Sequence, residues 1–138
     1  MKREEQKNLG SEEINVLTEK IIGCAYAVSN ELGACFLEKV YENAMTIELE
    51  ANGLTAESQK PISVQYRGKI VGEYFADLLV NDEIIVELKV AKSIDEAHIA
   101  QTINYLRACG KSCGLILNFG KPRVEVKRVV NRFKEAGV

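Results

Sequence analysis

An apolar run near the middle of the chain constrains the fold more than any other sequence feature. Residues 84–90 read Ile-Ile-Val-Glu-Leu-Lys-Val, so aliphatic side chains follow one another almost without interruption. Such a run predicts a strand that is buried on both faces of a sheet. The preceding residues, 75–83, predict the end of another strand and a tight turn at Asn81 and Asp82.

Two charged residues, Glu87 and Lys89, lie inside this predicted strand. Strand side chains alternate between faces, so residues two positions apart project from the same face. Burying a carboxylate or an ammonium costs several kcal/mol unless a partner replaces the lost hydration. A metal ion held by Asp77 and Glu87, with Lys89 directed at an anionic substrate, would compensate. The alternative is a strand end that surfaces and exposes both charges.

The composition is that of an ordinary globular domain. Hydrophobic residues make up 46% and charged residues 28% of the 138 positions, which excludes a disordered chain. We expect residues 1–10 to form a flexible leader and residues 11–138 to form one domain. No apolar run approaches the roughly 20 residues that cross a bilayer, and the charged N-terminus does not lead into a signal peptide. A cytoplasmic protein with no membrane partner is therefore predicted.

The few histidine and cysteine residues restrict the choice of metal. The only histidine is His98, and none of the four cysteines is spaced as CxxC. Structural zinc is therefore disfavoured, and buried reduced thiols are expected. A hydrolytic metal would need oxygen ligands, which favours Mg²⁺ or Mn²⁺ over zinc.

Charge is distributed unevenly, although the net charge is only −2. Acidic residues outnumber basic ones up to residue 59, and the balance reverses from residue 60 onward. The region after residue 120, which contains Lys121 and Arg123, is the most basic and could contact phosphates. A solvated strand and terminal helix would explain it equally well.

Hydrophobic periodicity predicts the remaining elements. Their expected order is helix 11–32, helix 37–51, strands 54–66, 70–80 and 83–90, a helix that ends at Gly110, and strands 112–118 and 124–130. Pro61 confines its strand to an edge of the sheet. The last helix is capped by Ser93 or Asp95, and the last two strands are close enough in sequence to pair as a hairpin.

Several polar positions are ambiguous when the residues are considered alone. Glu38 begins the second predicted helix, where the helix dipole favours a carboxylate without any further role. His98, Gln101 and Tyr105 lie on one side of the later helix, at positions i, i+3 and i+7. An exposed polar face is the simpler explanation of that stripe.

Taken in order, these elements and residues resemble the PD-(D/E)XK nuclease superfamily. Asp77, followed by Glu87-x-Lys89, matches its D…(E/D)xK signature, although Ala76 stands in place of the proline. Gln101-x-x-x-Tyr105 matches the QxxxY motif of the RecB-like branch. The resemblance implies an α/β fold of the restriction-endonuclease type. Its αβββαβ core would have a mixed central sheet flanked by helices, with an extra N-terminal helix here.

A closer resemblance is to the GxxExxY proteins, a small bacterial and archaeal group assigned to the same superfamily. It extends over about residues 14–130 and is carried by residues 37–41, 59–61, 76–77, 86–89, 98–101 and 104–106. Glu38 and Tyr41 occupy the last two positions of the GxxExxY motif. Cys35 replaces its glycine, so the backbone of this turn is where the chain departs from the group.

The resemblance implies hydrolysis of phosphodiester bonds with one or two Mg²⁺ (or Mn²⁺) ions. Asp77 and Glu87 would bind the metal together with the carbonyl oxygen of Leu88. Glu38 would complete the set directly or through water. Lys89 would orient the attacking water and stabilise the transition state.

Further roles follow from the same resemblance. Gln101 would position the water or a phosphate oxygen, and Tyr105 would contact the substrate backbone. Additional substrate contacts are expected from Tyr41, His98, Lys121 and Arg123. The expected partner is nucleic acid, DNA before RNA. The alternatives are a non-catalytic nucleic-acid-binding module, or an interaction protein that dimerises through helix 11–32 or the terminal strands.

Overall fold

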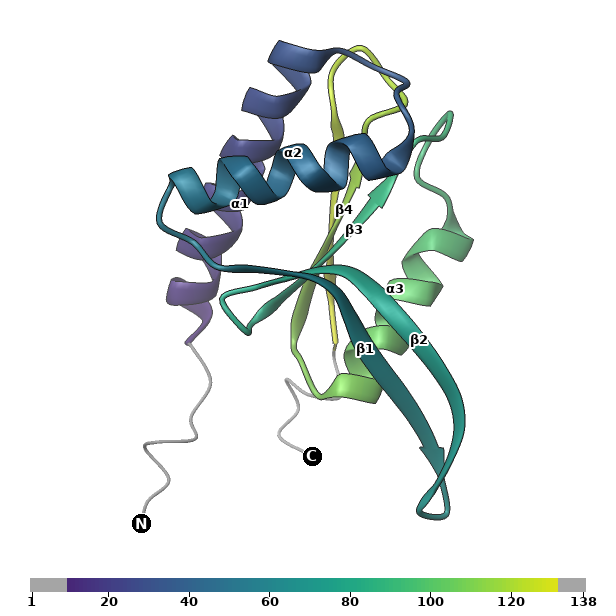
Figure 1. Ribbon diagram of the computed structural model, residues 1–138. Helices are drawn as coiled ribbons and strands as arrows, with labels where there is room; N and C mark the ends of the chain where they lie inside the picture. The colour runs from purple at the N-terminus through teal and green to yellow at the C-terminus, as the bar shows by residue number, and fades with distance from the viewer. Residues whose placement is uncertain (1–9, 132–138) are drawn as a thin grey trace.

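Five strands form one mixed sheet in which spatial order follows chain order, β1-β2-β3-β4-β5. The computed structural model describes residues 10–131 (Figure 1). Its elements are α1 (Ser11–Leu32), α2 (Glu38–Ala51), β1 (Ala56–Tyr66), β2 (Lys69–Val80), β3 (Ile84–Lys89), α3 (Glu96–Cys109), β4 (Cys113–Asn118) and β5 (Glu125–Val130). Neighbouring strands are antiparallel except β3 and β4, which are parallel. A parallel pair needs a crossover, and α3 supplies it.

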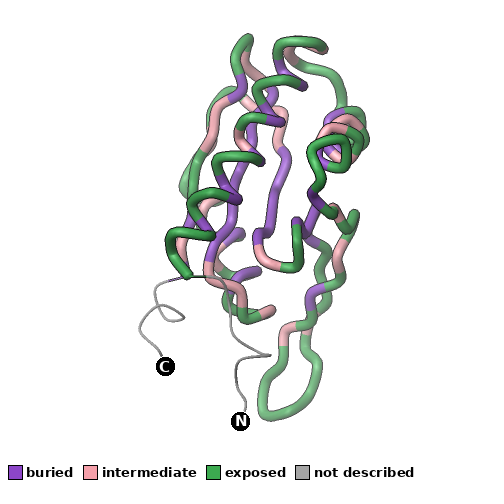
Figure 2. The backbone as a smooth tube through the Cα atoms, turned by 90° about the vertical axis from the view of Figure 1, so that its left-hand side faces the viewer, coloured by how far each residue is buried: buried purple, intermediate pink, exposed green. Residues whose placement is uncertain are grey.

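Helices cover both faces of the sheet (Figures 1 and 2). Alternate strand residues form two cores: Leu78 and Val86 pack with α1 and α2, whereas Leu79 and Ile85 pack with α3. Every residue of β3 except Lys89 is buried. The predicted α/β fold, with a mixed central sheet between helices, is therefore confirmed. The prediction of a strand that is buried on both faces is confirmed for β3.

The β1–β2 hairpin extends beyond the helices that cover the rest of the sheet (Figure 1). Its turn is Arg67–Gly68, where both residues have positive φ angles. The tube in Figure 2 is exposed along most of this end. We call residues 61–75 the hairpin arm. Pro61 lies in β1, at the edge of the sheet, as predicted.

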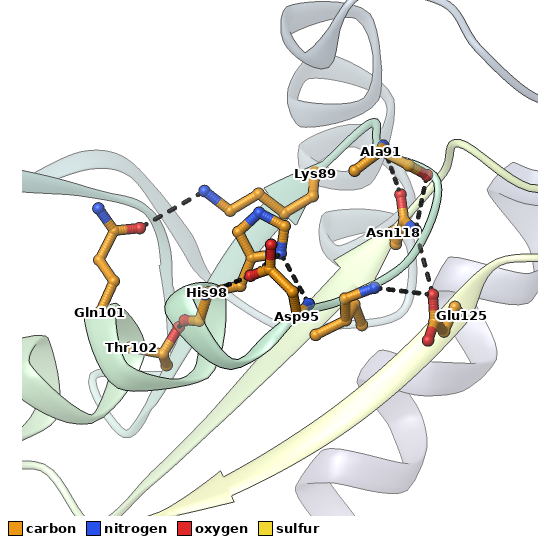
Figure 3. A network of polar contacts seen from close by, with 9 residues as sticks. Lys89, Ala91, Asp95, His98, Gln101, Thr102, Asn118 and Glu125 are labelled. Carbon is orange, nitrogen blue, oxygen red and sulfur yellow. Dashed lines mark hydrogen bonds and ion pairs between the residues drawn. The ribbon is translucent and has the colours of Figure 1, made fainter.

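Asn118, at the end of β4, is fully buried and connects two loops through hydrogen bonds (Figure 3). Its Oδ1 accepts hydrogen bonds from the backbone N–H groups of Ala91 and Gly120, both at 2.9 Å. Its Nδ2 donates to the Ala91 carbonyl at 3.0 Å and to Glu125 Oε1 at 3.1 Å. The loop that follows Lys89 is thus fixed against the loop between β4 and β5.

Several local predictions can be compared with the structure. The α3 N-cap is Asp95, one of the two residues predicted. The expectation of buried thiols holds for Cys24 and Cys113 but is wrong for Cys35, which is exposed in the turn between α1 and α2. Most of the predicted leader (residues 1–9) and the end of the basic region (132–138) lie outside the described residues.

None of the helices in residues 10–131 is long and apolar enough to span a membrane.

Candidate active site

Asp77 and Glu87 meet where strands β2 and β3 separate. The backbone pairing of these strands ends at Leu78 and Val86, so the next residues along, Asp77 and Glu87, lie just beyond it. Glu87 Oε2 accepts a hydrogen bond from the Asp77 N–H at 3.0 Å. Asp77 Oδ2 accepts one from the Leu88 N–H at 2.8 Å. Each carboxylate is therefore held by the backbone of the opposite strand.

This pair of carboxylates carries an electrostatic penalty. Burial, followed by repulsion from Asp77, raises the pKa of Glu87 to about 8. Burial also raises the pKa of Asp77, and the charges of Glu42 and Glu38 add to that effect. Among residues 10–131, no hydrogen-bond donor reaches the remaining oxygens, Asp77 Oδ1 and Glu87 Oε1. Two acceptor atoms in a region of unbalanced negative charge fit a cation.

The third carboxylate predicted for the site does not join this pair. In the described part of the chain, no group of three or more His, Cys, Asp or Glu side chains could hold a metal ion. Glu38 raises the pKa of both Asp77 and Glu87, so its charge acts on them from the start of α2. Two carboxylates fit Mg²⁺, because this ion usually retains several waters and takes few protein ligands.

Lys89 and two residues of α3 lie on the same side of the sheet as this pair. Lys89 Nζ is 3.4 Å from Gln101 Oε1 (Figure 3), and its charge lowers the pKa of both carboxyl groups. Tyr105 is buried, and its pKa is raised by burial and then by the charges of Glu87 and Asp77. The polar stripe of α3 therefore faces the carboxylates, at Gln101 and Tyr105, instead of being only a solvated surface.

Tyr41, one of the predicted substrate contacts, is held by partners from the fold itself. Tyr41 is fully buried, donates a hydrogen bond to the Gly33 carbonyl at 2.6 Å, and accepts one from the Phe36 N–H at 3.1 Å. Its ring also stacks on Phe119 with centroids 4.3 Å apart. These contacts fix the turn between α1 and α2 and leave the phenol no free face for a substrate.

His98 belongs to the N-terminal cap of α3 (Figure 3). Its Nδ1 accepts a hydrogen bond from the Asp95 N–H at 3.2 Å, and its own backbone N–H donates to Asp95 Oδ1 at 2.9 Å. Lys121 and Arg123 lie in the loop between β4 and β5. Lys121 Nζ is 3.6 Å from Glu125 Oε1, and Arg123 is exposed. Contacts of these three residues with a substrate remain predictions.

Comparison with known proteins decides the family. The sequence model of a family described as the PD-(D/E)XK nuclease superfamily matches residues 15–129. The chain belongs to this superfamily. Among solved structures, the crystal structure of SSO0001 is similar to this PD-(D/E)XK domain, with a TM-score of 0.55 and 19% sequence identity. The match covers 72% of this chain and 52% of that chain, so this chain spans about half the length of SSO0001. No curated protein matches it.

One carboxylate of this PD-(D/E)XK domain was missed in the sequence analysis. Glu42 on α2 is a buried carboxylate. It accepts hydrogen bonds from Gln59 Nε2 at 3.0 Å, from Ser58 Oγ, and from Lys39 Nζ at 3.1 Å. Gln59 would pair with Asp77 but is skipped in the β1–β2 register, and its φ is 55°. Glu42 thus ties α2 to β1 opposite Asp77. The sequence signal that could have identified it is its position four residues after Glu38, which places both carboxylates on the same face of the helix.

A groove beside the carboxylates was also missed, because it depends on how the hairpin arm packs. It lies between α3 and the arm, and its volume is about 1110 Å³. Gln101 and Tyr105 line it, and so does Tyr74 from β2. The ring centroids of Tyr74 and Tyr105 are 5.7 Å apart. In sequence, Tyr74 is one alternating strand residue among several, and nothing distinguishes it.

Proposed function

We propose that this PD-(D/E)XK domain is a metal-dependent nuclease that hydrolyses phosphodiester bonds of nucleic acid, with DNA the first candidate and RNA the second. The observation that carries the proposal is the pair of carboxylates formed by buried Glu87 and half-buried Asp77, with Lys89 beside it. Burying two like charges is costly, and in a nuclease superfamily member a cation and a phosphate account for that cost. We place this activity in the cytoplasm.

The residues that would hold the metal follow from the free acceptor atoms. Asp77 and Glu87 would bind Mg²⁺ or Mn²⁺ directly, with the Leu88 carbonyl as a further ligand. Glu38 would act through a water molecule, since its carboxylate lies outside the pair. When bound, such a metal supplies a water of lowered pKa and neutralises charge on the phosphate.

The other polar groups act on the substrate. The Lys89 ammonium would stabilise negative charge that develops on the phosphate oxygens. Gln101 holds Lys89 through its side-chain oxygen, which would leave its amide N–H groups for a phosphate oxygen or the attacking water. Tyr105 would donate its phenolic hydrogen to the substrate backbone. Its raised pKa keeps that hydrogen in place at neutral pH.

We also assign the chain to the GxxExxY branch. Cys35, at the position of the motif's glycine, has a φ of 73°, a conformation that favours glycine. A glycine would adopt this conformation without strain, which supports the match of Cys35 to the glycine position of the motif. Glu38 then begins α2 in the expected place.

The decisive experiment is a cleavage panel over single- and double-stranded DNA and RNA with Mg²⁺ or Mn²⁺. We expect metal-dependent cleavage by the wild type, and losses of at least about 100-fold in Asp77→Ala and Glu87→Ala. Glu73→Ala is the matched control, because Glu73 is an exposed carboxylate on the same strand as Asp77. Full cleavage by both site variants would remove the proposal.

A second candidate is a nucleic-acid-binding module that keeps the fold without catalysis. The specific observation in its favour is that the described residues contain no group of three metal-binding side chains. Such a module would bind nucleic acid equally well with Mg²⁺ or with a chelator, and would cut none of the four substrates.

A further inference from the structure

The groove between α3 and the hairpin arm is about as large as the largest small-molecule pockets. Its volume is about 1110 Å³, against roughly 300–1,000 Å³ for such pockets. It is also open along one side, between a helix and a two-stranded arm. An open groove of this size can hold part of a polymer that continues beyond it.

The groove adjoins the carboxylate site. Gln101 contacts Lys89 at 3.4 Å and also lines the groove. Tyr105 also lines the groove, and the charges of Glu87 and Asp77 add to burial in raising its pKa. A chain whose phosphate lies at the carboxylates would therefore extend along α3 towards the arm.

The side chains in the groove suit nucleobases. None of its lining residues in the described part of the chain is acidic, and small alanines of α3 alternate with polar groups. The polar and aromatic members are Ser63, Gln65, Tyr74, Gln101, Asn104, Tyr105 and Arg107. Amide side chains match the donor and acceptor edges of bases, aromatic rings stack on them, and a guanidinium attracts phosphate.

The exposed ring of Tyr74 favours an unpaired strand over a duplex. Its side chain is 48% exposed, and its ring lies 5.7 Å from that of Tyr105, tilted by 42°. An exposed ring of this kind gains from stacking on a base only if the base is unstacked from its neighbours. In a duplex the base faces are already covered, so the ring would gain nothing.

We propose that this groove binds an unpaired nucleic-acid strand next to the cleaved phosphate, with one base stacked on Tyr74. Asn104 and Gln65 contact base edges, and Arg107 contacts the backbone. The position of the strand relative to the cut rests on the proposed nuclease function, whereas binding itself does not. The substrate class is therefore single strands, or the unpaired ends and flaps of duplexes.

The test is equilibrium binding by fluorescence anisotropy in a chelator, so that no strand is cut. The probes are a labelled single-stranded DNA, the same sequence as RNA, and the same sequence in a blunt duplex. We expect the single strands to bind at least about 10-fold more tightly than the duplex. Tyr74→Ala should weaken single-strand binding by about 5- to 100-fold, the range for removing one stacking ring. Tyr74→Phe should stay within about 2-fold of the wild type, because it keeps the ring.

Matched controls separate this site from general effects. Tyr26→Ala removes an exposed tyrosine from α1, on the opposite face of the sheet, and should leave binding unchanged. Asn104→Ala, at a second exposed position in the groove, should weaken single-strand binding without altering the fold. Circular dichroism melting of each variant checks folding.

Each outcome has a distinct meaning. Equal binding of duplex and single strand, or unchanged binding in both Tyr74→Ala and Asn104→Ala, would overturn the groove proposal. If Glu87→Ala abolishes cleavage while these groove results fail, the nuclease proposal stands alone. If the wild type cuts nothing but Tyr74→Ala loses single-strand binding, the groove proposal stands and the nuclease proposal fails.

Discussion

At the scale of single residues, Cys35 holds a backbone conformation that favours glycine. Its φ is 73°, and its N–H donates to the Phe119 carbonyl at 3.0 Å, which ties the turn to the β4–β5 loop. A side chain in this region of φ costs about 1–2 kcal/mol. We expect Cys35→Gly to raise the free energy of unfolding by about 1 kcal/mol, because the relieved strain exceeds the entropy that glycine adds to the unfolded chain.

Urea unfolding monitored by circular dichroism measures this change. Cys35→Ala is the control, since it removes the thiol but keeps the Cβ and therefore the strain. Its stability should stay at or below that of the wild type. A gain in Cys35→Ala equal to that in Cys35→Gly would show that the thiol, and not the backbone, is responsible.

Glu87 makes stability depend on pH in the metal-free protein. Its pKa is about 8 in the folded state and near 4.5 when the chain is unfolded. Because the folded pKa is raised, the penalty is absent below about pH 4.5, grows as the pH rises towards 8, and is complete above 8. We expect Glu87→Gln to be more stable than the wild type at pH 9, by up to a few kcal/mol.

The measurement is the difference in unfolding free energy between wild type and Glu87→Gln at pH 5, 7 and 9 in a chelator. The difference should become more favourable to the variant across this series. If the difference in unfolding free energy is the same at all three pH values, Glu87 is ionised throughout, and a neighbouring cationic group already compensates for its charge.

At the scale of elements, the loops after β3 and β4 pack too closely for any side chain at Gly120. A Cβ there would lie 2.2 Å from the Ala91 carbonyl oxygen and 2.5 Å from its nitrogen. Backbone on both sides cannot move aside without breaking the hydrogen bonds of Asn118. We expect Gly120→Ala to lower the free energy of unfolding by at least about 2 kcal/mol.

Gly23→Ala is the matched control for this substitution. Nothing lies within 4 Å of a Cβ at Gly23, which is exposed inside α1. Alanine should therefore stabilise the helix by roughly 0.5–1 kcal/mol. Thermal melts of the two variants should move in opposite directions. A neutral Gly120→Ala would mean that the two loops separate readily.

Glu42 links α2, which carries Glu38, to β1 opposite Asp77. Its hydrogen bonds to Gln59 and Ser58 fix the spacing between these two elements. If the proposed function holds, Glu42→Gln should lower kcat by about 10-fold, since a small displacement of Glu38 is costly. KM should change little, because Glu42 does not contact the substrate. Steady-state cleavage kinetics measure this split, and a rise in KM alone would contradict a positioning role.

At the scale of the whole molecule, the sequence predicted the fold well because the decisive patterns are local. The apolar run around Glu87 marks the central strand, and turn residues such as Asn81 and Gly68 mark the hairpins. Glu87 and Lys89 were identified because strand alternation places them on one face, and Asp77 was identified because its spacing from them matches the D…(E/D)xK signature. Glu42 and Tyr74 were missed because their roles depend on partners from β1 and α3. Tyr41 illustrates the same limit, since burial against Phe119 is set by tertiary packing.

Metal binding should couple the two halves of the sheet, because Asp77 lies on β2 and Glu87 on β3. The metal binds carboxylates, so Glu87 must lose its proton, and affinity should rise as the pH passes its pKa of about 8. We expect saturating Mg²⁺ to raise the melting temperature of the wild type by several degrees at pH 8.5, and by clearly less at pH 6.5. In Asp77→Asn the shift should disappear at both pH values, whereas Glu73→Ala should keep it. Differential scanning fluorimetry reports this without any substrate. A shift of equal size at both pH values, or one that persists in Asp77→Asn, would place the bound metal away from Asp77 and Glu87.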